Sequence, residues 1–154
     1  MAATRTTIIR NTNLETIIKY EGSSVDTAAT IDISTLTATT QARNSETPTV
    51  NIVKFIATGL LTSGVTVVRN SVTVLAAAPE NAICVDLTQD RISDNIQNTS
   101  NIVITTTGAA STGYLVLRKV AGWATKVEDA TYGAYDDVTR VGASTTVSGS
   151  PDKV

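Results

Sequence analysis

Side chains branched at Cβ are the feature that most limits what this chain can fold into. Threonine alone makes up roughly 18% of the 154 residues, and valine and isoleucine add many more. Such side chains lose χ1 freedom in a helix, whereas they pack well on the pleated surface of a sheet. With one Phe, one Trp and four Tyr, the core must be aliphatic. A chain of this length forms about one domain, and we therefore predict a single all-β body.

The β-prone runs are short and are separated by turn-forming residues, and no long helical period lies between them. Residues 29–33, for example, alternate apolar and polar side chains as a half-buried strand does. This spacing is typical of antiparallel architectures. The predicted fold class is therefore all-β, an antiparallel β-sandwich or barrel. The predicted strands are residues 2–10, 14–20, 29–33, 49–57, 65–69, 72–75, 82–87, 101–107 and 114–120.

The clearest local signal is a hairpin. Two β-branched runs, 65–69 and 72–75, flank Asn70 and Ser71, and asparagine tolerates the left-handed backbone of a tight turn. Its pairing should set Val67 opposite Val74 and Arg69 opposite Val72.

A second hairpin is predicted between residues 101–107 and 114–120, joined by the small, flexible segment 108–113. The polar segment 34–48 is predicted to be a long surface loop. Residues 88–101 should also form a loop, with at most one helical turn.

Three regions are predicted along the chain. Residues 1–13 form an N-terminal arm or edge strand, residues 14–123 form the sandwich body, and residues 124–154 form a C-terminal assembly tail. Adjacent Ile8 and Ile9 cannot both face one core in an extended segment, so one should contact something else. The tail has too little apolar surface to fold alone. We expect a partner to receive its larger side chains, so the candidate interface residues are Ile8, Ile9, Trp123, Tyr132, Tyr135, Val138 and Val141.

The charge balance argues against some partners. Only 17% of residues are charged, the net charge is −2, and the 12 basic residues are scattered. Nucleic-acid binding needs clustered Lys and Arg, so none is expected. No stretch reaches the ~18 apolar residues of a membrane span, and no secretory signal is recognisable. We therefore expect no membrane partner and synthesis in a cytosol.

The absence of histidine removes the commonest general base and the commonest transition-metal ligand. We expect no catalytic residues, no cofactor and no metal, and so no enzyme. Asp86, Asp90 and Asp94 recur every fourth residue and could bind calcium on a helix, but a solvated acidic loop is favoured. Residues 108–113 lack the lysine of a phosphate-binding loop.

Cysteine and lysine–asparagine chemistry are also disfavoured. Cys84 lies in an apolar run and is predicted to be a small buried hydrophobe rather than a reactive thiol. A spontaneous crosslink between Lys19 or Lys54 and Asn51 or Asn101 is disfavoured against ordinary structural roles.

Several segments of the sequence resemble those of a known group of proteins. These segments are residues 4–16, Val67–Asn70, residues 96–103 and Leu117–Trp123. Together they are similar to small virion proteins of tailed phages that infect marine and freshwater cyanobacteria. The resemblance covers about residues 4–123 and leaves the tail uncovered.

This resemblance implies a non-enzymatic virion structural protein, made in the host cytoplasm and located in the virion. The role it implies is a capsid cement or decoration protein, whose partners are the major capsid protein or other virion proteins and copies of itself. The alternatives are a head-to-tail connector, tail or fibre component of the same particle. A β-sandwich carbohydrate- or receptor-binding module is another alternative, and it would need an aromatic platform of Trp123 with Tyr114, Tyr132 or Tyr135.

Overall fold

The computed structural model describes residues 3–23, 27–43, 47–92 and 96–125. This part of the chain is nearly all β-structure, with one short 3-10 helix, η1 (Ile33–Thr35). The strands are β1 (Arg5–Asn11), β2 (Glu15–Gly22), β3 (Thr27–Ile31), β4 (Gln41–Arg43), β5 (Thr49–Gly59), β6 (Gly64–Arg69), β7 (Val72–Ala77), β8 (Asn81–Asp86), β9 (Ile102–Thr107), β10 (Ser111–Ala121) and β11 (Trp123–Thr125).

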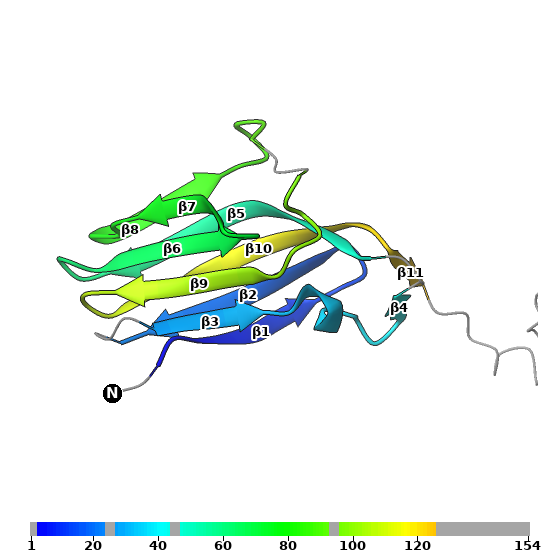
Figure 1. Ribbon diagram of the computed structural model, residues 1–154, viewed down its shortest axis with the longest axis horizontal. Helices are drawn as coiled ribbons and strands as arrows, with labels where there is room; N and C mark the ends of the chain where they lie inside the picture. The colour runs from blue at the N-terminus through cyan, green and yellow to red at the C-terminus, as the bar shows by residue number, and fades with distance from the viewer. Residues whose placement is uncertain (1–2, 24–26, 44–46, 93–95, 126–154) are drawn as a thin grey trace, which may run out of the picture. The chain divides into compact units, whose positions relative to one another are not determined.

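Two antiparallel sheets face each other and form a β-sandwich (Figure 1). The larger sheet has the strand order β1-β2-β10-β5-β8, and the smaller has the order β3-β9-β6-β7. A two-stranded pair, β11-β4, lies apart from both. The predicted fold class is confirmed, and the sandwich is the correct one of its two alternatives.

The chain divides into two compact units, Met1–Ala124 and Thr125–Val154. The first unit holds the sandwich. Except for Thr125, the second lies outside the described residues, and with it the predicted assembly tail.

The core follows from strict alternation along the central strands. In β2, β6, β9 and β10 every second side chain is buried. Tyr20 and Phe55 stack in this core with ring centroids 6.1 Å apart. The remaining core is aliphatic, as the composition predicts, and both sheets contribute to it. Its fully buried members include Ile18, Leu36, Val50, Val65, Val67, Ile102, Ile104, Leu115 and Leu117.

The first predicted hairpin exists, with Asn70 and Ser71 in the left-handed region at φ 48° and 64°. Arg69 pairs with Val72 as predicted. The other predicted pair is wrong, because Val67 lies opposite Leu75 rather than Val74. A register irregularity between Val67 and Val68 leaves Val74 as an extra residue that packs against the core.

The second predicted hairpin is wrong. β9 pairs with β3 and β6 in the smaller sheet, whereas β10 pairs with β2 and β5 in the larger one. The linker therefore crosses from one sheet to the other. Gly108, at φ +69°, makes the crossing possible, because a Cβ there would lie 2.1 Å from the carbonyl oxygen of Thr62.

The segment 34–48 is not simply a surface loop. Ile33, Leu36 and Ala38 are buried, and the segment contains β4. The Asp32 side chain accepts a hydrogen bond from the Ser34 backbone N–H, 2.9 Å away, and so caps η1. The short helix lets the chain turn inward and cover one end of the core. Within residues 88–92 and 96–101 no helix is present.

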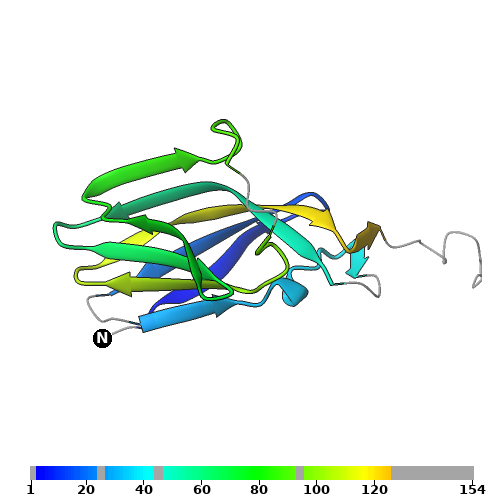
Figure 2. The ribbon, with the colours of Figure 1, turned by 45° about the horizontal axis from the view of Figure 1, so that its top comes forward.

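The N-terminal segment is an edge strand of the larger sheet, paired with β2. A register irregularity between Ile8 and Arg10 leaves Ile9 as an extra residue. The Thr4 backbone N–H donates to the Thr27 hydroxyl, 2.6 Å away, and the Thr4 hydroxyl donates to the Thr27 carbonyl oxygen, 2.8 Å away. These bonds join the β1 and β3 edges and close one side of the sandwich. At the opposite side, β8 is the uppermost strand in Figure 2.

Candidate assembly surface

Within the described part of the chain, the four strands of the smaller sheet place no charged side chain on its outer face. The only charged residue in its four strands is Arg69, which is buried. The register places outward side chains in rows across the strands, such as Thr30, Val103 and Val68. We call this surface the neutral face. Its members are Ala28, Thr30, Thr66, Val68, Thr73, Ala76, Val103, Thr105 and Thr107.

Such a composition is unusual for a solvated surface, which is commonly 25–35% Lys, Arg, Glu and Asp. Four strands spaced about 4.8 Å apart, each about 20 Å long, give a face of roughly 20 Å by 20 Å. Its side chains are short and β-branched, so covering them costs little side-chain entropy. The neutral face can therefore lie against a partner without removing charges from water.

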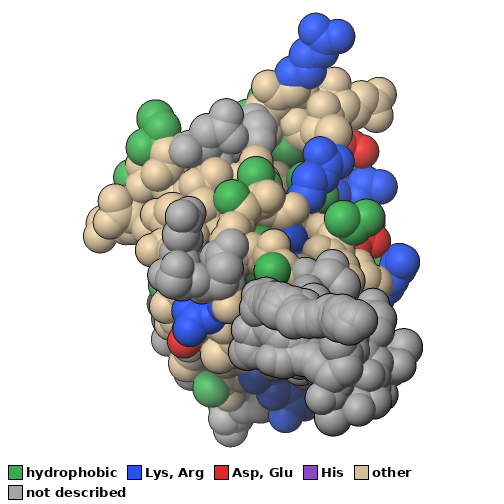
Figure 3. All heavy atoms as spheres, turned by 90° about the vertical axis from the view of Figure 1, so that its right-hand side faces the viewer, with side chains coloured by type: hydrophobic (Ala, Val, Ile, Leu, Met, Phe, Trp, Pro, Cys, Tyr) green, Lys and Arg blue, Asp and Glu red, His purple; other side chains and the backbone are tan. Residues whose placement is uncertain are grey.

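The larger sheet differs, because ion pairs lie on its outer side near β1. Arg5 Nε lies 2.9 Å from Glu21 Oε2, and Lys19 Nζ lies 3.8 Å from Glu21 Oε1. The hydrogen bond from Arg5, then the charges of Arg5 and Lys19, lower the pKa of the Glu21 carboxyl below its usual value. A third pair joins Arg10 and Glu15 at 3.2 Å. In the end-on view of Figure 3, acidic and basic side chains lie side by side along the right-hand flank.

Ile8 and Ile9, two of the predicted interface residues, both lie on β1. Ile8 pairs with the buried Ile18 but remains 44% exposed on the edge strand β1. Ile9, the extra residue of the irregularity, is 53% exposed. Neither isoleucine is buried within its own domain, so both are available to a partner.

The loop between β5 and β6 presents two leucines that the sequence analysis missed. Leu60 and Leu61 are 65% and 68% exposed. The loop is nonetheless held in place: the Leu60 N–H donates to the Ala110 carbonyl oxygen, 3.4 Å away, and the Ser63 N–H donates to the Leu60 carbonyl oxygen, 3.0 Å away. The sequence did contain a signal for them. The two leucines lie between Gly59 and Gly64, in a turn between strands that would normally carry polar residues.

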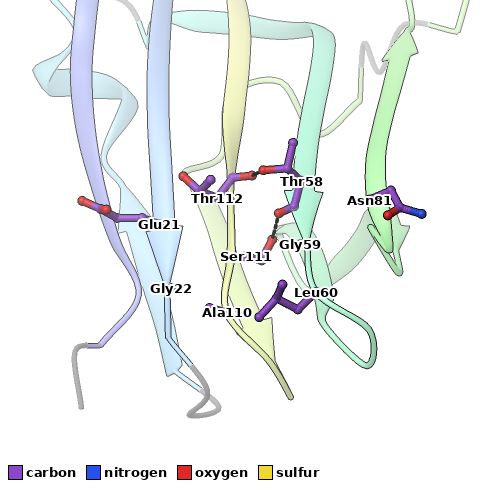
Figure 4. Close-up of a pocket in the computed structure, with 9 residues that line it drawn as sticks. All are labelled: Glu21, Gly22, Thr58, Gly59, Leu60, Asn81, Ala110, Ser111 and Thr112. Atoms are coloured by element: carbon purple, nitrogen blue, oxygen red, sulfur yellow. Dashed lines mark hydrogen bonds between the residues drawn. The ribbon is translucent and has the colours of Figure 1, made fainter.

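A groove of about 460 Å³ runs beside this loop across one end of the larger sheet (Figure 4). Its hydroxyl groups are already used. The Ser111 hydroxyl donates to the Thr58 carbonyl oxygen, 3.0 Å away, and the Thr112 hydroxyl donates to the Tyr20 carbonyl oxygen, 2.9 Å away. Glu21, its one carboxylate, is engaged in the ion pairs described above. Asn81 adds one side-chain amide at the β8 side of the groove. Among the described residues, this single group does not make the set of convergent polar groups that orients a small ligand.

Trp123 packs against its own core. Its indole Nε1 donates to the Thr49 carbonyl oxygen, 3.1 Å away, and the Lys119 ammonium lies 4.9 Å from its ring centroid. Tyr114 lies nine positions earlier in the chain, about 30 Å away if fully extended. Trp123 and Tyr114 therefore do not form a joint platform for a sugar ring. The other predicted interface residues, Tyr132, Tyr135, Val138 and Val141, lie outside the described residues.

Lys119 is buried at the same end of the sandwich. Its ammonium donates to Asn11 Oδ1, the Thr12 carbonyl oxygen and Gln41 Oε1, at 2.7, 2.7 and 2.6 Å. Burial lowers the pKa of this amine to about 8. Lys119 thus joins β10 to the end of β1 and to β4, and its role is to tie these elements together.

The prediction for Cys84 is wrong, because this residue is exposed. β8 is the edge strand of its sheet, and only Ile83 and Val85 turn toward the sandwich interior and become half-buried. An apolar run does not reveal that its strand has a neighbour on one side only.

The acidic residues that were weighed for calcium do not form a site in the described part of the chain. Asp86 Oδ1 accepts hydrogen bonds from the backbone N–H groups of Thr88 and Gln89, at 3.1 and 2.9 Å, and so closes a turn. Asp94 lies outside the described residues. Among those described, no three Asp, Glu, Cys or His side chains gather closely enough to hold a metal ion.

Three of the four candidates for a spontaneous crosslink, Lys19, Asn51 and Asn101, have other partners. Lys19 pairs with Glu21. Asn101 Oδ1 accepts a hydrogen bond from the Ile33 backbone N–H, 3.1 Å away. Asn51 Oδ1 accepts one from Asn98 Nδ2, 3.0 Å away. These side chains serve the packing of loops against strands.

No family model matches the sequence, and no curated protein matches it. Among solved structures, a cupin superfamily protein from Desulfitobacterium hafniense DCB-2 is similar over 77% of this chain and 78% of that chain. The sequence identity is 8% and the TM-score is 0.32, and a likeness this remote says nothing about what the chain does. No helix among the described residues has the length and apolar character needed to cross a membrane.

Proposed function

We propose that the chain is a non-enzymatic structural subunit of a virus particle, a cement or decoration protein on the head shell of a tailed phage. The observation that carries this proposal is the neutral face of the smaller sheet. Its four strands place nine outward side chains without a charge on one surface. Burying an ion costs several kcal/mol unless it is paired well. A face without ions avoids that cost when it lies on the major capsid protein or another virion protein.

Exposed apolar side chains support the same role. Leu60 and Leu61 project at one end of the sandwich, and Ile8 and Ile9 lie along β1. Apolar side chains held on rigid elements make good contacts with a partner, because little ordering is needed on binding. The resemblance to small cyanophage virion proteins covers residues 4–123, and the predicted contacts of residues 124–154 would add to these surfaces.

Charge insertion on the neutral face tests the proposal. Thr66→Lys and Thr105→Lys, made separately, place an ammonium in the middle of two central strands. Each variant should fold, because both side chains point away from the core. Binding to particles that lack this protein should weaken at least tenfold, since the inserted charge must be removed from water.

The matched control is Thr39→Lys, an exposed threonine in the loop between η1 and β4. It adds the same charge away from the neutral face and should leave particle binding unchanged. Equal binding of all three variants would exclude the neutral face as the contact. Separating heads from tails before the binding measurement distinguishes a cement protein from a connector, tail or fibre component.

A further inference from the structure

Among the described residues, strand β8 is the sheet edge that is least protected. It is regular from Ala82 to Asp86, although Asn81 has a φ of 81° and the Asp86 carbonyl oxygen accepts from the Asp90 backbone N–H, 3.2 Å away. Sheet edges are normally blunted by Lys, Pro, bulges or covering segments, because an open row of N–H and C=O groups invites another strand. β8 contains none of these residues, and its pairing with β5 has no register shift. It is also the uppermost strand of the larger sheet in Figure 2, with the smaller sheet below it.

The other edges carry more protection. β1 has an extra residue at Ile9 and two arginines. β3 is regular, but β1 lies beside it and Thr4 bonds to its first residue, Thr27. β7 has an extra residue at Val74, and a bulge increases the local twist of an edge. The protected edges make β8 the position where a strand is added most readily.

The backbone groups that β8 offers can be identified from its pairing. Val85 lies opposite Phe55, and the Leu87 N–H donates to the Val53 carbonyl oxygen, 3.0 Å away. Alternate residues of an antiparallel strand bond to opposite sides. Ile83, Val85 and Leu87 therefore bond to β5, and the N–H groups of Ala82, Cys84 and Asp86 point to the open edge.

The sequence of this edge is complementary to itself. A two-fold axis through Cys84 would pair Cys84 with its own copy and Ala82 with the copy of Asp86. No like charges would meet. On the inner side, half-buried Ile83 would meet the copy of Val85, so each apolar side chain gains an apolar neighbour.

The outer side of the sheet continues the same pattern. The register sets Tyr114, Ile56 and Cys84 in one row across β10, β5 and β8. A second copy would extend this row through its own Cys84, Ile56 and Tyr114. We propose that β8 pairs antiparallel with β8 of a second copy of this chain, centred on Cys84, and joins the two five-stranded sheets into one.

This inference deepens the proposed role, on which it rests for its biological meaning, because it names one partner of the subunit. It also makes a covalent prediction. Residues directly opposite in such a hydrogen-bonded pair have Cα atoms about 5.5 Å apart, which lies within the range of a disulfide. Since the chain has a single cysteine, any covalent dimer formed on oxidation must join Cys84 to its copy.

The experiment measures the mass of the full-length protein in solution, before and after mild oxidation. We expect a dimer that oxidation converts into a covalent dimer. Cys84→Lys, which places two ammonium groups on the two-fold axis, should weaken self-association at least tenfold, whereas Cys84→Ser should retain it. Thr73→Lys on β7 is the control for added charge and should leave the dimer intact.

Register is tested in a Cys84→Ala background. Ala82→Cys alone should not form a covalent dimer, while Ala82→Cys combined with Asp86→Cys should. A monomer at micromolar concentration would overturn the inference, as would a dimer that neither crosslinks at Cys84 nor responds to Cys84→Lys. These outcomes concern self-association alone, so they are distinct from the particle-binding outcomes that test the proposed function.

Discussion

Lys119 shows how one buried residue organises an end of this molecule. Its three acceptors come from β1, from the turn after it and from β4, which are far apart in the sequence. The sequence around residue 119 does not predict these three acceptors, because Arg118 and Lys119 look like an ordinary pair of exposed basic residues. The alternation along β10 does predict that residue 119 faces inward, and that signal could have identified the buried lysine.

We expect Lys119→Met to destabilise the fold. Methionine fills a similar space but donates no hydrogen bond, so the Thr12 carbonyl oxygen loses the donor it has in Lys119. Asn11 Oδ1 keeps the Thr16 hydroxyl as a donor, and Gln41 Oε1 keeps the Ala38 backbone N–H. A buried polar group left without a partner costs about 1–3 kcal/mol. Arg118→Met, at the exposed neighbouring position, should change the free energy of unfolding by about 0.5 kcal/mol or less. Chemical denaturation of both variants measures the difference, and equal stabilities would contradict the tying role.

The same lysine should make stability depend on pH. Its pKa is lowered from 10.5 to about 8 in the folded state, so above pH 8 the unfolded chain binds a proton that the folded chain has released. The free energy of unfolding should therefore rise with pH from about 8 toward 10. Burial raises the pKa of Tyr20 above 10.0, and this opposes the trend at higher pH. This rise in the free energy of unfolding should be missing in Lys119→Met. If the variant still showed the rise, another titrating group would be its cause.

At the scale of the element, β10 depends on a glycine near its start. A Cβ at Gly113 would lie 2.1 Å from the Ile56 carbonyl oxygen and 2.7 Å from Tyr20 Cε1. Because backbone and a stacked ring cannot both move aside, Gly113→Ala should destabilise by about 1–3 kcal/mol.

Gly64→Ala provides the matched control for that prediction. A Cβ at Gly64 would lie 2.5 Å from the Thr107 hydroxyl oxygen and would approach no other residue closely, and that hydroxyl can rotate away. Thermal unfolding should separate the two variants clearly. If Gly113→Ala and Gly64→Ala had the same melting temperature, the close approach of β5, β2 and β10 would not restrict residue 113 to glycine.

The strands were largely predictable because one face of each central strand is buried. Apolar and polar side chains therefore alternate along its sequence. Which strand pairs with which was not predictable. β9 and β10 follow one another and carry the same period, yet the buried face of each belongs to a different sheet. The prediction that Cys84 is buried was wrong for a related reason, because its exposure follows from the position of β8 at the edge of the sheet. The Val67 register was missed because an extra residue within β7 has no local signature.

At the scale of the whole molecule, charge is distributed unequally between the two sheets. Ion pairs decorate the larger sheet, whereas the smaller sheet presents only neutral, short side chains. The low charged fraction was visible in the sequence, but its concentration on one sheet required the strand order. This asymmetry is what makes a sandwich of this kind suited to lie flat on a larger assembly.

The composition of the virus particle tests the central claim most directly. Under the proposed function a tailed phage encodes this chain; its particles would be purified and separated into heads and tails, and the chain would be quantified by mass spectrometry against the major capsid protein. The account predicts that the chain is present in many copies, in a fixed ratio to the capsid protein, and in the head fraction. Its absence from purified particles would contradict the proposed function, whatever the oligomeric state of the isolated protein.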